Sequence, residues 1–212
     1  MKKIFITILF AYCTSILSQT TTHNISDIYG GEKEGVYYKD VDSLLNDYIG
    51  TWRYSIVNSD GTTTSLKIKL RKLVNQEYNS PVVGTYYEDV IIGTYQYVNH
   101  NEEKFNNLST LYSDIPYWTY NLYGNRLIGN NNSPFCSDCS LNKKRLKLLY
   151  TETDRPGLLS SLIIRKSINA DGIQILNVKI WQLNNLIINN DVQPINTTMN
   201  IPFGDFILIK QP

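Results

Sequence analysis

The stretch Gly50-Thr51-Trp52-Arg53-Tyr54-Ser55-Ile56 decides the fold class that the sequence predicts. Trp52, Tyr54 and Ile56 alternate with polar residues, which is typical of a β-strand with one buried side and one solvent-facing side. Residues 40–47 precede the stretch and can form one or two helical turns, with acidic side chains near their start. The sequence therefore predicts a short helix that leads into the first strand of a sheet.

Strand patterns continue to the end of the chain. Residues 66–71 alternate between aliphatic and basic side chains, as a half-buried antiparallel strand requires. The turn residues at 58–61 and 169–172 predict tight hairpins, and Gly93 is interpreted as a barrel corner. Further strands are expected at 82–98, 145–151, 158–167, 173–182 and 206–210. The pattern predicts an all-β fold, a single antiparallel barrel of about eight to nine strands with one short N-terminal helix.

The first 18 residues have the composition of a signal peptide. Lys2 and Lys3 precede the apolar run 4–17, and the small residue Ser18 stands at the expected cleavage site. The run is shorter than the roughly 20 residues that span a bilayer. Cys13 follows a tyrosine inside the run, which is the wrong context for lipid attachment. We therefore expect export to the periplasm or the exterior, with no membrane span and no lipid anchor.

The chain from Gln19 onward has a length that suits one domain. Residues 19–39 are polar and contain three glycines, so they are expected as a flexible leader to a β-barrel domain at 40–212. Two of the 20 Lys and Arg are lost with the signal peptide, so 18 remain against 19 Asp and Glu, a net charge of −1. A chain without a positive field is not expected to bind nucleic acid.

Two cysteines remain after the signal peptide, Cys136 and Cys139, and they have C-x-x-C spacing. In an oxidising compartment this pair is expected to close a small disulfide loop. A redox-active pair is one alternative, but it favours the start of a helix in a βαβ unit, which the sequence lacks. A zinc site is the other, and it needs two more ligands where the chain offers only His23 and His100. No metal and no other cofactor is expected.

Residues suited to catalysis form no recognisable pattern, so no enzymatic activity is expected. His23 lies in the leader and His100 in a turn, and neither has a sequence partner that would make it a general base. The pairs Glu88-Asp89 and Glu102-Glu103 are adjacent, so on a strand the two members of each pair point to opposite faces. That arrangement does not place two carboxylates on either side of one bond.

The helical turn before Gly50-Thr51-Trp52, the antiparallel strands and Lys210 on the last strand resemble the calycin superfamily of lipocalins, fatty-acid-binding proteins and avidins. The resemblance implies a lipocalin-like barrel in which Trp52 plugs the closed end and Lys210 covers its ring in a cation–π contact. The chain departs from that family in its closing Lys, its missing Thr-Asp-Tyr signature and its long segment 101–142. Such a barrel is filled by its inward side chains or holds one small ligand among them. The inward candidates are Tyr54, Ile56, Leu66, Ile68, Leu70 and Tyr95.

A second resemblance covers nearly the whole chain, which is similar to an uncharacterised family of small exported proteins from Bacteroidota. The residues that carry it are Tyr48–Trp52, Ile92–Val98, Cys136 and Ile201–Phe203. This resemblance implies an exported setting and the same kind of fold, but it implies no chemistry.

Two functions follow as hypotheses. The first is a binding protein that holds a small apolar ligand inside the barrel, in the cell envelope. The second is a filled barrel that contacts a partner protein or a glycan through the segment 101–142. Aromatic side chains in that segment have flat faces and polar tips that suit surface binding. They are Tyr112, Tyr117, Trp118 and Tyr120.

Overall fold

The computed structural model describes residues 20–140, 142–155, 158–182 and 198–212. The expected signal peptide at 1–18 lies outside them. The described strands are β1 (Thr21–Asn24), β2 (Val36–Lys39), β3 (Gly50–Val57), β4 (Thr63–Ser80), β5 (Gly84–Asn99), β6 (Glu102–Asn106), β7 (Leu122–Ile128), β8 (Arg145–Thr151), β9 (Leu159–Ile168), β10 (Gln174–Gln182) and β11 (Gly204–Lys210). Four short 3-10 helices accompany them, η1 (Ile25–Gly30), η2 (Leu44–Tyr48), η3 (Leu108–Tyr112) and η4 (Tyr117–Thr119). No described helix is long and apolar enough to cross a membrane.

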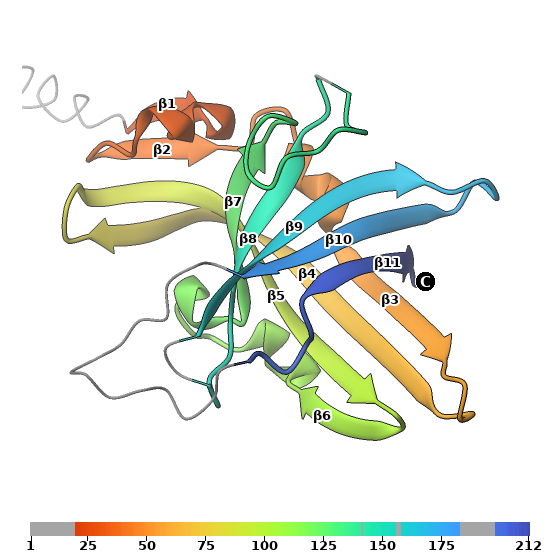
Figure 1. The fold of residues 1–212 in the computed structure, drawn as a ribbon. Helices are drawn as coiled ribbons and strands as arrows, with labels where there is room; N and C mark the ends of the chain where they lie inside the picture. The colour runs from red at the N-terminus through yellow and green to blue at the C-terminus, as the bar shows by residue number, and fades with distance from the viewer. Residues whose placement is uncertain (1–19, 141, 156–157, 183–197) are drawn as a thin grey trace, which may run out of the picture.

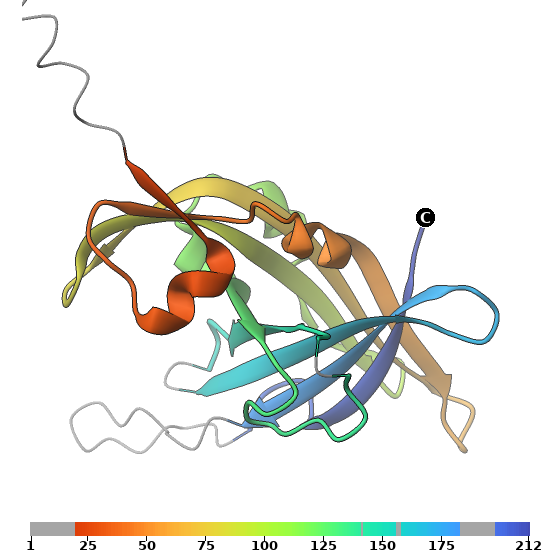
Figure 2. The same ribbon diagram turned by 90° about the horizontal axis from the view of Figure 1, so that it is seen from above.

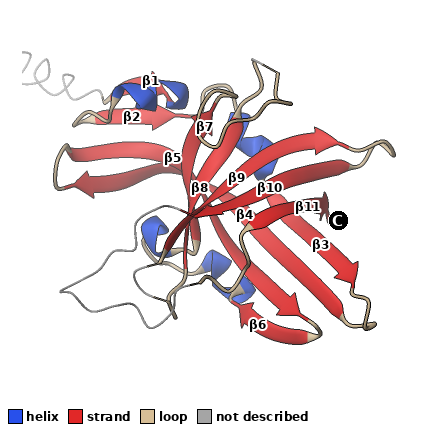
Figure 3. Cartoon of the chain, viewed as in Figure 1, coloured by secondary structure: helices blue, strands red, loops and turns tan. Residues whose placement is uncertain are grey.

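Eight of the strands close into an antiparallel barrel, which confirms the predicted fold class (Figures 1 and 3). The barrel runs in the order β3-β4-β5-β7-β8-β9-β10-β11, and β11 returns to pair with β3 through Ile209–Arg53 and Lys210–Trp52. Each strand therefore pairs with the next barrel strand along the chain, the up-and-down arrangement that removes open edges. The expected helix over 40–47 is η2, which ends two residues before β3.

The two longest strands, β4 and β5, extend past the barrel as a hairpin arm (Figure 1). A bulge between Leu73 and Gln76 of β4 separates the barrel half of the strand from the arm. β5 pairs with β7 only over Ile91–Gly93, and its arm half pairs with β2 instead. β5 therefore leaves the barrel wall beside β7, and the two strands form a fork.

Gly93 lies where the barrel wall is tightest, because β5 there pairs with β4 on one side and β7 on the other. A Cβ atom at this position would lie 2.6 Å from Leu70 Cδ2 and 3.1 Å from the Lys69 carbonyl oxygen. The absence of a side chain at Gly93 therefore allows β4 and β5 to pack closely at this point.

Residues 21–39 differ from the expected flexible leader. They form β1, η1 and β2, which lie along the hairpin arm, and η1 contacts β7 (Figure 2). Ile28 of η1 and Val36 and Tyr38 of β2 are buried against Tyr86 of β5 in a small separate cluster. The segment is ordered because β5 offers a free edge beyond the fork and because its own apolar side chains cover that edge.

The segment 101–142 also differs from expectation, because it contains barrel strand β7. β6 pairs with the end of β5, and η3 and η4 fold back over the outer face of β5 before β7 enters the wall. Deleting this segment would therefore open the barrel, so it is no detachable surface excursion.

Candidate functional site

Trp52, Lys210 and Gly50 lie together where β3 begins. Trp52 is fully buried, and its indole Nε1–H donates to the Tyr48 carbonyl oxygen at 2.9 Å. The Lys210 ammonium lies 5.4 Å from the centroid of the Trp52 ring, within cation–π range. Gly50 begins β3 with a φ of +129°, and a Cβ there would lie 3.6 Å from Lys210 Cε. These residues hold the turn from η2 into β3.

The barrel interior is occupied by side chains that pack against one another. Leu66, Ile68, Leu70 and Tyr95, predicted to line a cavity, are 2% exposed or less and belong to one continuous core cluster. Tyr54 is half-buried at its edge. Ile56 corrects the prediction, since 44% of it is exposed. β11 pairs with β3 only at Trp52 and Arg53, so the end of β3 projects past the core.

The four aromatic residues proposed for surface binding divide into two groups. Tyr112 is 75% exposed beside Arg71, and Trp118 is 42% exposed. Tyr117 and Tyr120 are buried, which corrects their expected surface position. They pack with Val90, Ile92 and Leu111 on the outer face of β5, because η3 and η4 fold back over that strand.

The fork between β5 and β7 contains a cavity of about 340 Å³ on the outer side of the barrel wall. We call it the tyrosine pocket. Its lining comes from the N-terminal segment, the hairpin arm, η4 and the outer faces of β7, β8 and β9. The residues are Ile28, Glu32, Tyr78, Tyr86, Glu88, Tyr117, Tyr123, Gly124, Asn125, Arg126, Lys147, Leu149 and Ser161.

Four tyrosine rings line this pocket. The Tyr78 ring lies 5.4 Å from that of Tyr86, 6.1 Å from that of Tyr117 and 5.5 Å from that of Trp118. The Tyr123 ring lies 6.1 Å from that of Tyr117, at 71° to it. These tilted and edge-on arrangements are favourable between aromatic rings. They form a wall of ring faces and edges from three separate parts of the chain.

Glu88 provides a buried carboxylate to the pocket. Its two oxygens accept hydrogen bonds from the Tyr117 hydroxyl and from Asn125 Nδ2, each at 2.5 Å. Asn125 Nδ2 also donates to the Asp89 carbonyl oxygen at 3.0 Å, which ties β7 to β5 beyond their ladder. Burial raises the pKa of Glu88, and the two hydrogen bonds oppose that rise. Burial and the nearby Glu88 raise the pKa of Tyr117, which keeps its hydroxyl a donor.

Two cations and a second acid complete the polar lining. Arg126 is exposed and its Nη2 lies 3.7 Å from Glu32 Oε1, so this pair links the N-terminal segment to β7. Burial, with a smaller contribution from Arg126, lowers the pKa of Lys147. Ser161 of β9 is 1% exposed, and its hydroxyl has no hydrogen-bond partner among the described residues.

Tyr117 is the one predicted site residue among the residues that line this pocket, and it was expected at the surface. Glu88 and Asp89 do have different partners, as expected of adjacent residues on a strand, and both are buried. The available signal was Glu88 itself, a carboxylate two residues from Tyr86 and from Val90 in a strand of otherwise β-forming residues. A charged side chain in such a strand needs a partner or a function.

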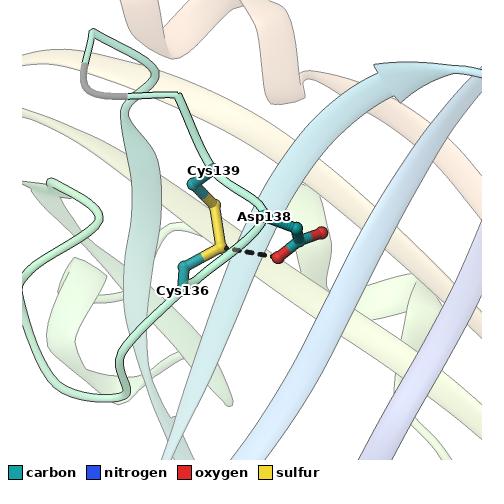
Figure 4. Close-up of side chains that lie close together, drawn as sticks. All are labelled: Cys136, Asp138 and Cys139. Carbon is teal, nitrogen blue, oxygen red and sulfur yellow. Dashed lines mark hydrogen bonds between the residues drawn. A yellow bond between two sulfur atoms is a disulfide. The ribbon is translucent and has the colours of Figure 1, made fainter.

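The predicted disulfide between Cys136 and Cys139 is confirmed (Figure 4). Asp138 Oδ1 lies 3.2 Å from Cys136 Sγ, and Arg165 of β9 donates to Asp138 Oδ2 at 2.7 Å. The three residues bring ligand-type atoms within 4.8 Å of one another. Metal binding requires thiolates, however, and the disulfide uses both sulfurs. The disulfide therefore closes a short loop that the Arg165–Asp138 contact attaches to the outside of β9.

Replacing both cysteines with serine is expected to lower the free energy of unfolding by about 2 kcal/mol, because so short a loop removes little chain entropy. Urea titration of the oxidised protein and the double variant measures the difference. Ser137→Ala, inside the same loop, is the matched control and should change little. A loss above about 4 kcal/mol would show that the loop organises more of the barrel than its own turn.

The fold and the pocket define a class: an up-and-down β-barrel with an aromatic pocket on its outer wall, bounded by an N-terminal segment. The chain belongs to a protein family described as "Family of unknown function (DUF6705)", whose model matches residues 1–211. Its expected membership of an uncharacterised family is thereby confirmed, whereas the origin in Bacteroidota stays a prediction. No curated protein and no solved structure gives a significant match.

Proposed function

We propose that this protein is an exported, non-enzymatic binding protein that holds a small ligand in the tyrosine pocket. The barrel serves as its scaffold. The ligand site thus moves from the barrel interior, where the candidate side chains pack against one another, to the fork outside it. The disulfide and the signal-like residues 1–18 support export.

The observation that carries the proposal is the composition of one cavity. About 340 Å³ is enough for a small molecule, since ligand pockets span roughly 300–1,000 Å³. Its lining combines four tyrosines and two aliphatic side chains with polar and charged groups that converge on it, and such a combination is common in binding sites. One of these groups, the buried Ser161 hydroxyl, lacks a hydrogen-bond partner among the described residues. A bound ligand would supply one.

Ser161→Leu is expected to abolish ligand retention, because the larger apolar side chain occupies the cavity from the β9 side. Native mass spectrometry of the exported protein measures it, as an added mass that leaves on mild activation. Ser161→Ala is the matched control: it removes the hydroxyl but keeps the space, so it should retain the ligand more weakly than the parent protein.

Circular dichroism and urea titration establish that both variants remain folded. An added mass that Ser161→Leu retains in full would place the ligand elsewhere and overturn the proposal. A protein that is bare when purified and takes up no small molecule from an extract of its host would also count against it.

A further inference from the structure

Glu88 differs from the other buried carboxylates of the described residues. Asp40 and Asp89 share Lys72, whose Nζ lies 2.7 Å and 3.7 Å from them, and Glu152 has Arg155 at 3.4 Å. None of the ion pairs within 4.0 Å in the described part of the chain includes Glu88. Its two oxygens accept hydrogen bonds only from two neutral donors among the described residues. Buried charges are ordinarily paired. Glu88 therefore stands out among the buried carboxylates, because it has no cation beside it in the part of the chain that the structure describes.

The rings beside Glu88 supply the second half of a cation site. Tyr86 and Tyr117 are buried, Tyr78 lies between them, and Tyr123 packs against Tyr117. The face of an aromatic ring attracts a cation within about 6 Å of its centroid, and cages of such rings bind ammonium groups. A carboxylate at the bottom of a cage adds charge pairing to that attraction.

Neither cation of the pocket forms an ion pair with Glu88, although the charge of Arg126 favours the ionised form of Glu88 from a distance. Arg126 is engaged with Glu32 and is more than half exposed, so this pair is close to neutral where the N-terminal segment meets β7. Lys147 is the other cation of the lining, and burial lowers its pKa. The pocket therefore has an aromatic region with the buried Glu88 carboxyl group and a mixed region at Glu32, Arg126 and Lys147.

We infer that the tyrosine pocket binds a small organic ammonium ion, with the cationic group among the tyrosines and against Glu88. The inference rests on the proposed function and names the chemical class of its ligand. Burial raises the pKa of Glu88, and a bound cation would oppose that rise by favouring the ionised carboxylate. A polar group on the same ligand would reach the Ser161 hydroxyl or the Glu32–Arg126 pair.

Choline and 3,3-dimethylbutan-1-ol are the probes, because they have nearly the same shape and differ in the positive charge. Isothermal titration of the ligand-stripped exported protein measures both. Choline is expected to bind at least about tenfold more tightly than the neutral alcohol, from the charge pair and the ring faces together. Glu88→Gln keeps the side-chain size and removes the charge pair alone, so it is expected to weaken choline binding and to leave the affinity for the alcohol nearly unchanged.

The comparison of the two probes on the unchanged protein stands even if Glu88→Gln fails to fold. Equal binding of the two probes would overturn the cation inference, as would glucose or N-acetylglucosamine binding where choline does not. In either case a ligand still occupies the pocket, and the proposed function is retained. If choline gives no signal at millimolar concentration, the inference fails. The Ser161→Leu experiment then decides the proposed function separately.

Discussion

Replacing Trp52 with alanine is expected to lower the free energy of unfolding by about 3–5 kcal/mol, as truncation of a large buried aromatic residue does. The side chain is fully buried, so its removal leaves a cavity that the barrel end cannot fill. The Tyr48 carbonyl oxygen also loses its hydrogen bond from the indole, and Lys210 loses the ring beneath it. Urea titration followed by circular dichroism measures the loss.

Trp181→Ala is the matched control, because Trp181 is 42% exposed on β10 and also lies near a lysine, Lys179, at 5.9 Å. It is expected to cost less than about 1 kcal/mol, as exposed positions usually do. Lys210→Met removes the cation–π contact together with an exposed hydrogen bond from Lys210 Nζ to Gln174 Oε1, and it should cost about 0.5–1 kcal/mol. If Trp52→Ala and Trp181→Ala lose equal stability, Trp52 does not plug the barrel.

Every barrel strand except β7 was predictable, because the signals for the other seven are local. A strand was expected at 145–151, and β8 spans Arg145–Thr151; the turn residues at 58–61 and 169–172 do join β3 to β4 and β9 to β10. Each signal depends on residues a few positions apart, on alternation or on turn chemistry. When successive strands are joined by hairpins and each pairs with the next, few topologies other than a sandwich or a barrel are possible.

The pocket was not predictable, because it depends on contacts between distant residues. Its tyrosines come from β4, β5, η4 and β7, and nothing local indicates that Tyr78 and Tyr117 meet. The order of residues 21–39 depends on a free edge of β5 that exists only because β7 leaves it at the fork. Tyr117 and Tyr120 occur in a polar, turn-rich stretch, which is typical of a surface segment. They are buried because η3 and η4 fold back over β5.

Lys72→Met is the second large effect that we expect, a loss of about 3–5 kcal/mol in the free energy of unfolding. Lys72 is the common partner of Asp40 and Asp89, whose side chains are 0% and 1% exposed. Asp40 accepts from the backbone amides of Leu44 and Leu45 and so fixes the start of η2. Removing the ammonium leaves two buried carboxylates without a cation, and breaking a buried pair in this way is costly.

Lys179→Met tests whether burial is the cause. Lys179 pairs with Asp205 at 3.1 Å, but the two side chains are 39% and 73% exposed, so water screens the charges and the loss should stay below about 1 kcal/mol. The two variants remove the same ammonium group, once from a buried ion pair and once from an exposed one.

Because Asp89 also accepts a hydrogen bond from the Tyr37 hydroxyl at 2.6 Å, Lys72→Met should loosen β2 from β5 and raise amide exchange in residues 36–39. Equal losses for Lys72→Met and Lys179→Met would mean that water reaches Asp40 and Asp89, and the N-terminal segment would then depend on its apolar contacts alone.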